Sequence, residues 1–158
     1  MDYSQKQNRL DIWNNKKKQL AVEAMSNMNI RSNDYVPRQR DVYWVFFGEN
    51  IGHEITDSIT QNSIKRHPGV VVSSDLYNQN GMVVIAPLTS GPVRQGKHLL
   101  DCQYLIKSNK YQFLSKDCVL ELDQVRSIST ARLSSKVGWI NSSDWDKIEL
   151  RIKKVFRL

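Results

Sequence analysis

The sequence predicts a mainly β protein with α elements: a compact antiparallel β-barrel with one helix added at each end. Short apolar runs of strand length follow one another from Asp41 onward, separated by turn signals and by no helical pattern. Apolar residues recur at helical spacing before this region and after it. A chain of 158 residues fits one domain with an appendage. We therefore expect a helical extension and linker over residues 1–38 and a single domain over residues 39–158.

The first thirty residues predict a helix with a narrow apolar face. Residues spaced by three, four or seven positions form this face: Leu10, Trp13, Leu20, Ala24 and Met28. The run Lys16–Lys18 interrupts the face, and we expect these lysines to point outward. The following segment, residues 27–39, is rich in Asn, Ser, Asp and Pro and predicts a linker.

Six short runs predict the strands of the barrel. They are residues 42–47, 70–72, 82–88, 99–106, 119–122 and 125–129. Between the second and third runs, Tyr77–Gly81 ends in Asn-Gly, which favours a tight reversal of the chain. Because no helix intervenes, an antiparallel barrel is expected rather than a parallel α/β sheet.

The end of the chain predicts an amphipathic helix. Ser143, followed three residues later by Asp146, resembles a capping box. The residues expected on the apolar face are Trp145, Ile148, Ile152, Val155 and Phe156. Basic residues near the end of this helix would complement its dipole.

Composition narrows the functional classes. No apolar run approaches the roughly 20 residues of a membrane helix, and the polar start lacks a signal peptide, so a cytoplasmic protein is expected. Cys102 and Cys118 do not form a metal-binding pattern, and we expect neither a metal nor another cofactor. The net charge is +7, of which residues 1–40 contribute +4 from eight Lys/Arg and four Asp/Glu. This balance favours a polyanionic partner, and Lys16–Lys18 are possible contacts for it.

Five segments, in order over about 100 residues, carry a family resemblance. They are Arg40–Val45, Gly52-His53-Glu54, Pro68–Ser73, Ala86–Gly91 and Asp123–Ile128, with Arg132-Leu133 and Lys136-Val137-Gly138 following in register. Together they resemble the PemK/MazF toxins, and the PemK (Kid) branch most closely. The resemblance leaves residues 1–38 unexplained.

The resemblance implies an SH3-like twisted barrel and a homodimer. It also implies the toxin component of a type II toxin-antitoxin system, whose cognate antitoxin binds through a tail that is usually acidic. The implied activity is a sequence-specific, metal-independent endoribonuclease that cuts single-stranded RNA, as an mRNA interferase does. In that reaction the 2′-hydroxyl attacks the adjacent phosphate and leaves a 2′,3′-cyclic phosphate, which requires a base, an acid and a cation near the phosphate.

The resemblance also assigns candidate site residues. His53 and Asp123 match residues with acid or base roles, and Thr89 matches a position near the scissile phosphate. The catalytic cation is expected from Arg66 or from charged His67. The residues expected to bind RNA are Glu54, Lys65, Ser90 and Gln124.

Two departures from the family pattern keep alternatives open. The family generally has arginine before the proline that opens the second strand, whereas this chain has His67 there and Arg66 one residue earlier. A second arginine of the PemK branch is replaced by Glu121. One alternative is therefore a catalytically impaired, RNA-binding relative. The other is a CcdB-like inhibitor of DNA gyrase, which would not need Gly52-His53-Glu54 or Thr89-Ser90.

Overall fold

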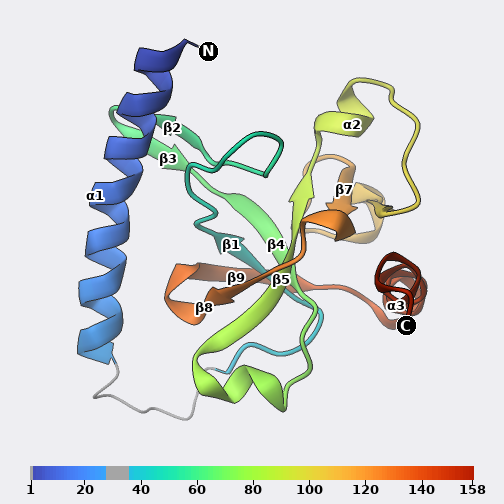
Figure 1. Ribbon diagram of the computed structural model, residues 1–158. Helices are drawn as coiled ribbons and strands as arrows, with labels where there is room; N and C mark the ends of the chain where they lie inside the picture. Colours follow the sequence, from blue (N-terminus) through green and yellow to red (C-terminus); the bar gives the residue numbers. More distant parts are fainter. Residues whose placement is uncertain (1, 28–35) are drawn as a thin grey trace.

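A computed structural model describes residues 2–27 and 36–158 of the chain. It shows a strongly twisted antiparallel sheet with a long helix along one side and a second helix at the opposite side (Figure 1). The elements are, in chain order, α1 (Tyr3–Asn27), β1 (Asp41–Val45), β2 (Ser58–Thr60), β3 (Ser63–Lys65), β4 (His67–Val71), η1 (Tyr77–Asn80), β5 (Met82–Thr89), α2 (Gly91–Arg94), β6 (Gln103–Ile106), η2 (Ser108–Lys110), β7 (Cys118–Glu121), η3 (Leu122–Gln124), β8 (Arg126–Ser129), η4 (Thr130–Arg132), β9 (Leu133–Trp139) and α3 (Ser142–Phe156). The predicted fold class, mainly β with a helix at each end, is confirmed.

Strand β5 organises the sheet. The strands follow the order β6-β7-β5-β4-β1-β9, and β8 also pairs with β5. The start of β5 pairs with β8, its middle with β4 and its last two residues with β7. All of these pairs are antiparallel, as the absence of helices between the predicted strands had indicated. Strands β2 and β3 form a separate hairpin beside α1.

Two hydrophobic clusters fill the two sides of the sheet. One gathers Val42, Val70, Leu88 and Leu120 against Ile148 of α3. The other contains Tyr43, Val45, Phe47, Val71, Val83, Ile85 and Ile128. Adjacent residues of β1 and of β4 enter different clusters because successive side chains of a strand point to opposite faces.

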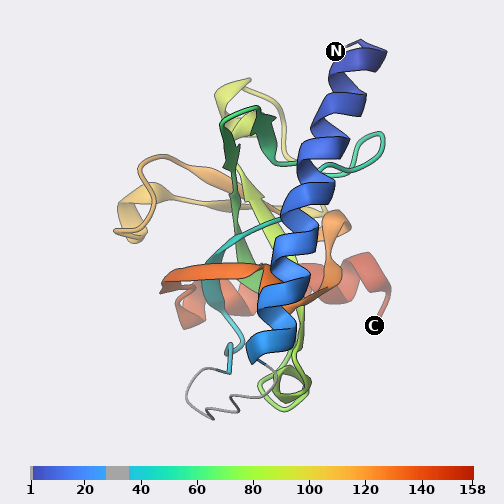
Figure 2. The same cartoon turned by 90° about the vertical axis from the view of Figure 1, so that its left-hand side faces the viewer.

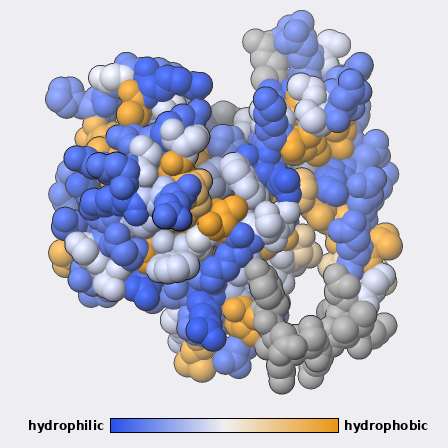
Figure 3. All heavy atoms as spheres, turned by 180° about the vertical axis from the view of Figure 1, so that it is seen from behind, coloured by the Kyte–Doolittle hydropathy of each residue, from blue (hydrophilic) through white to orange (hydrophobic). Residues whose placement is uncertain are grey.

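The docking of α1 is the feature that matters most for the site. Trp13 and Leu20, 4% and 7% exposed, pack with Ile59 of β2. Leu10 is 36% exposed and contributes less, while Met28 and the expected linker residues 28–35 lie outside the described residues. In Figure 3, α1 at the upper right is hydrophilic over much of its outer surface. The apolar face is therefore shorter than predicted, and it faces the barrel.

One of the three lysines does not simply face solvent. The Nζ of Lys16 lies 5.0 Å from the centroid of the Phe46 ring, whereas Lys17 and Lys18 are exposed as expected. The aliphatic stem of a lysine can cover apolar surface while its charge stays near water, which explains this placement.

The C-terminal helix begins differently from the prediction. Its N-cap is Asn141, whose side-chain oxygen accepts a hydrogen bond from the Asp144 amide at 2.8 Å, so the proposed Ser143–Asp146 capping box is wrong. Asp144 is itself buried and accepts hydrogen bonds from the hydroxyls of Tyr104 and Tyr111. Trp145 and Ile148 are buried as predicted, whereas Phe156, placed on the same face, is 51% exposed.

Several strands were not predicted because their sequences lack a strand pattern. β2 and β3 have three residues each, of which two are polar, and β9 contains Ser134-Ser135-Lys136. The run expected over residues 99–106 becomes a strand only from Gln103. The expected tight reversal is a 3-10 turn, η1, that ends at Gly81 with φ +80°. None of the helices within the described residues is both long and apolar enough to span a bilayer.

Candidate functional site

A closed loop between β1 and β2, residues 48–57, carries His53 at its exposed tip; we call it the His53 loop. The amide of Gly48 donates to Oδ2 of Asp57 at 2.8 Å, and the amide of Asp57 donates to the Gly48 carbonyl at 2.9 Å. Gly48 has φ +89°, a conformation that favours glycine. The Asn50 side chain also donates to the carbonyls of Phe47 and Ile55. The neck of the loop is therefore firmly closed, and the tip projects from the body of the protein (Figure 2).

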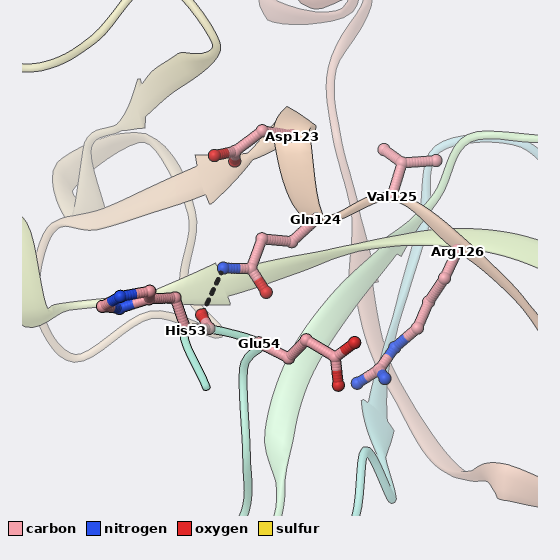
Figure 4. Close-up of a pocket in the computed structure, with 6 residues that line it drawn as sticks. All are labelled: His53, Glu54, Asp123, Gln124, Val125 and Arg126. Atoms are coloured by element: carbon pink, nitrogen blue, oxygen red, sulfur yellow. Dashed lines mark hydrogen bonds between the residues drawn. The ribbon is translucent and has the colours of Figure 1, made fainter. Parts of the chain in front are cut away.

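The His53 loop and the turn after β7 form a cleft of about 310 Å³, the His53 cleft. Its lining residues are His53, Glu54, Asp123, Gln124, Val125 and Arg126. The Gln124 side chain joins its two walls, because Oε1 accepts from the Ile55 amide at 2.6 Å and Nε2 donates to the His53 carbonyl at 3.0 Å. Figure 4 shows the His53 ring and the Asp123 carboxylate extending to the same side of this amide. The structure thus brings together four of the predicted site residues: His53, Glu54, Asp123 and Gln124.

Arg126 is the positive charge of this cleft, and the sequence analysis did not select it. Its guanidinium lies 4.9 Å from the centroid of the Phe47 ring, and Nη2 donates to the Ile55 carbonyl at 3.5 Å. Its buried Nε has no hydrogen-bond partner among the described residues. Burial and the nearby Arg132 lower the pKa of Arg126, while Glu54 and Asp57 raise it. Figure 4 shows the Glu54 carboxylate turned toward the Arg126 guanidinium. A bound phosphate could take the place of this carboxylate beside the guanidinium.

A buried carboxyl group lies beneath the neck of the loop. Burial raises the pKa of Asp57 from 3.8 to about 6, although the amide of Gly48 and the charge of Arg126 lower it. The Oδ1 atom of Asp57 has no hydrogen-bond partner within residues 2–27 and 36–158. Oδ2 of this carboxylate therefore binds the loop neck, whereas Oδ1 is buried without a hydrogen bond among the described residues.

His67 is placed poorly for the role of a charged group. It starts β4 opposite Val45, and burial lowers the pKa of its imidazole, with backbone hydrogen bonds to Leu88 and Thr56 raising it in part. A lowered pKa favours the neutral form of the ring. These electrostatics argue against His67 as the cation that replaces the family's arginine.

Arg66 points to the other side of the β2–β3 hairpin. Its guanidinium donates to the Ser134 hydroxyl and lies 5.1 Å from the centroid of the Phe46 ring. Arg66 and Lys16 line a groove of about 600 Å³ between α1 and the hairpin, which we call the α1 groove. Lys65 is the exposed last residue of β3. The structure does not bring Arg66 or Lys65 into the lining of the His53 cleft.

Thr89 and Ser90 lie at the far end of β5. Thr89 pairs with Val119 of β7, and its hydroxyl accepts a hydrogen bond from the Gly91 amide at 3.2 Å. Ser90 occupies the position before α2. The two views place α2 apart from the His53 loop (Figures 1 and 2), so a ligand that contacts both regions must extend across the surface between them.

Comparison with known families decides the class of the protein. A family model described as "PemK-like, MazF-like toxin of type II toxin-antitoxin system" matches residues 38–156. The chain belongs to the PemK/MazF toxin family. The match begins at residue 38, whereas α1 ends at Asn27, so this helix lies outside the family segment.

Solved structures of MazF toxins share the fold. The MazF structure from Deinococcus radiodurans is 20% identical, with a TM-score of 0.59, over 79% of this chain and 100% of that one. An endoribonuclease from a mycobacterial species is 14% identical, with a TM-score of 0.57, over 78% of this chain and 94% of its own. The Mycobacterium tuberculosis toxin MazF-mt6 is 15% identical, with a TM-score of 0.54, over 75% and 98% of the two chains. No curated protein sequence matches the chain significantly.

In this PemK/MazF toxin, the residue that the resemblance places at the branch's second arginine lies in the core. Glu121 is 8% exposed and accepts a hydrogen bond from Gln103 Nε2 at 2.8 Å, and burial raises its pKa. It cannot supply the lost positive charge. Arg126 follows Asp123 by three residues in the family motif, and that proximity was the only sequence signal for its place in the cleft.

Proposed function

We propose that this toxin is a metal-independent endoribonuclease that cuts single-stranded RNA at particular sequences. The observation that carries the proposal is the His53 cleft, where an imidazole, a carboxylate and a guanidinium line one solvent-open space. Attack of the 2′-hydroxyl on the adjacent phosphate requires side chains of these kinds: a base, an acid and a cation. The similar mycobacterial protein described as an endoribonuclease supports the same activity.

His53 and Asp123 would act as the acid–base pair. One of them takes the proton of the 2′-hydroxyl while its oxygen forms a bond to phosphorus. The bond from phosphorus to the 5′-oxygen then breaks, and the other residue gives a proton to that leaving oxygen. The products are a 2′,3′-cyclic phosphate and a free 5′-hydroxyl. Histidine suits this exchange at neutral pH, because its ordinary pKa lies near 6.5.

Arg126 would stabilise the charge that develops on the phosphate. It lines the cleft with His53, and a guanidinium stays protonated at all working pH values. Arg66 would instead contact RNA outside the cleft, since it lies on the far side of the β2–β3 hairpin. Glu54 and Gln124 line the cleft beside the reacting groups, where they can contact neighbouring nucleotides, and Thr89 and Ser90 would contact RNA that continues toward α2.

The partners follow from the family. We propose a cognate antitoxin, with an acidic tail suited to the basic chain, and a homodimer as the active form. The similar solved structures include a MazE–MazF complex from Deinococcus radiodurans and a mycobacterial endoribonuclease with its cognate antitoxin.

Incubation of the purified protein with a long single-stranded RNA in excess EDTA tests the proposal. We expect cuts at a short recurrent motif, cyclic-phosphate or 3′-phosphate ends, and loss of cutting in His53→Ala. Products with 3′-hydroxyl ends, or loss of activity on chelation, would overturn the mechanism. A gel shift without cleavage would support the impaired RNA-binding alternative, and gyrase-dependent DNA breaks would support the gyrase inhibitor.

A further inference from the structure

We infer that α1 is a positioning element for the active site: Lys6, Arg9 and Trp13 fix both ends of the His53 loop and thereby hold His53 in the cleft. The expected effect on the cleavage rate rests on the proposed ribonuclease function. The expected effect on the order of the His53 loop does not. None of these three residues lies in the family segment 38–156, and none lines the His53 cleft.

The first anchor is a buried carboxylate at the start of the loop. The Glu49 side chain is fully buried and forms ion pairs with Lys6 Nζ and with Arg9 Nη2, the latter at 2.7 Å. Arg9 Nε and the Thr56 hydroxyl donate to its Oε2 at 2.8 and 3.0 Å. A buried carboxylate with this many donors is held firmly, and losing one donor leaves it badly solvated.

The same two basic residues also hold the loop backbone. Lys6 Nζ donates to the Asn50 carbonyl near the start of the loop, and Arg9 Nη2 donates to the Asp57 carbonyl at its end, at 2.7 Å. One helical turn of α1 therefore binds both ends of the loop, near the neck where they come together. These contacts fix the separation between the two ends of the loop. The hydrogen bonds between Gly48 and Asp57 alone would allow the loop to bend about its neck.

Trp13 supplies an apolar anchor one turn further along. Its indole lies against Gly48. The guanidinium of Arg132 lies over the same indole, 5.3 Å from the ring centroid. Arg132 Nη1 also donates to the Phe47 carbonyl at 3.3 Å, directly before the loop. Figures 1 and 2 both show α1 running past the base of this loop.

The path from these anchors to His53 is short. On one side the loop is tied to α1 through residues 49, 50 and 57. On the other side Gln124 binds the His53 carbonyl and the Ile55 amide. His53 is exposed and would otherwise sample many positions, so two-sided attachment of the loop keeps its ring near the position from which it can react.

The test uses full-length variants with a matched control. Arg9→Met removes both the bond to Glu49 and the bond to Asp57, whereas Lys147→Met removes one charge from an exposed position of α3. Arg9→Lys keeps the charge and serves as the conservative variant if Arg9→Met fails to fold. Two quantities are measured well below the melting temperature: hydrogen exchange of the amides of Ile55 and Asp57 without RNA, and the single-turnover cleavage rate at saturating protein.

We expect the amides of Ile55 and Asp57 to exchange about tenfold faster in Arg9→Met. The cleavage rate should fall by about 10²-fold, with the half-saturating protein concentration unchanged, because misplacement of a reacting group by about 1 Å has that effect. Arg9→Lys should recover part of the rate, and Lys147→Met should match the unmodified protein. Unchanged exchange and rate in a folded Arg9→Met would overturn the inference, as would a loss confined to RNA affinity. If the unmodified protein does not cut RNA, the proposed function fails while the exchange measurement still decides the inference.

Discussion

Trp13 lies so close to Gly48 that a Cβ atom built on this glycine would be 2.2 Å from Cε2 of the indole. The contact joins a helix outside the family segment to the first residue of the His53 loop. The contact leaves no room for a side chain larger than that of glycine. The positive φ of +89° is a second reason for glycine at this position.

We therefore expect Gly48→Ala to destabilise the protein by about 3 kcal/mol or more, because left-handed strain and overpacking each cost about 1–3 kcal/mol. Gly52→Ala is the matched control, since Gly52 has φ +60° but no atom within 4 Å of a Cβ built there. It should show the strain alone. Urea denaturation of both variants measures the free energy of unfolding, and equal losses would contradict the packing part of the argument.

Asp57 should make the stability depend on pH. Its pKa is raised from 3.8 to about 6 in the folded protein, so the folded state binds more protons than the unfolded state between about pH 4 and 6. Stability should accordingly fall as pH rises through this window and stay low above it. Asp57→Asn removes the cost of the buried charge, which is worth up to about 3 kcal/mol at pH 7 for a shift of about two pKa units.

Denaturant unfolding of Asp57→Asn and the unmodified protein at several pH values from 4 to 8 checks this prediction. The variant should be the more stable at pH 7, and the difference should shrink toward zero near pH 4. A variant that is less stable at every pH would mean that the charge of Asp57 is needed by Arg126 and Arg132.

Arg126 should matter more for cleavage than Arg66. Removing one group that stabilises transition-state charge typically lowers the rate by about 10²–10³, and we expect this loss in Arg126→Met. Arg66→Met is the matched control, because it removes the same charge from the far side of the hairpin. Single-turnover cleavage at saturating protein measures both, with far-ultraviolet circular dichroism as the check on folding. A larger loss in Arg66→Met would instead indicate Arg66, next to the family's usual arginine position, as the catalytic cation.

The α1 groove should bind RNA phosphates outside the cleft. Lys16 and Arg66 line it, both stacked on Phe46, and no ion pair to a carboxylate is found for either within the described residues. Each lost phosphate contact on a single strand removes roughly 0.7 from the log–log salt slope of binding, so Lys16→Gln with Arg66→Gln should lower it by about 1.4. The double variant Lys17→Gln with Lys18→Gln, which lies outside the groove, should change the slope less. Equal slopes for the two double variants would sink this site.

The sequence predicted those parts of the fold whose pattern is local. The apolar run 82–88 predicts a strand and forms β5, in which residues 83–88 are buried or half-buried. Trp13 and Leu20 lie on the face expected to dock. Asn141 was missed as a cap because Asn, Ser, Ser and Asp follow one another there, and each can cap a helix. The choice of N-cap residue depends on Asp144. Its carboxylate accepts hydrogen bonds from the hydroxyls of Tyr104 and Tyr111, which are distant from it in the sequence.

The site was predictable only as far as the family motifs reach. His53, Glu54, Asp123 and Gln124 do meet in one cleft, while their catalytic and RNA-binding roles stay predictions, as does the division of the chain at residue 38. The direction of Arg66 could not be foreseen, because the unrecognised β2–β3 hairpin turns it toward Ser134. The place of Arg126 depends on the turn at Gln124, which no local pattern specifies.

The attachment of α1 to Glu49 and Asp57 has a consequence for how such toxins diversify. Two proteins with identical cleft residues can differ in how fast they cut, if only one of them carries a basic residue equivalent to Arg9. Substitutions in a segment without any reacting group would then tune toxicity, and an alignment restricted to residues 38–156 would report the two enzymes as equivalent.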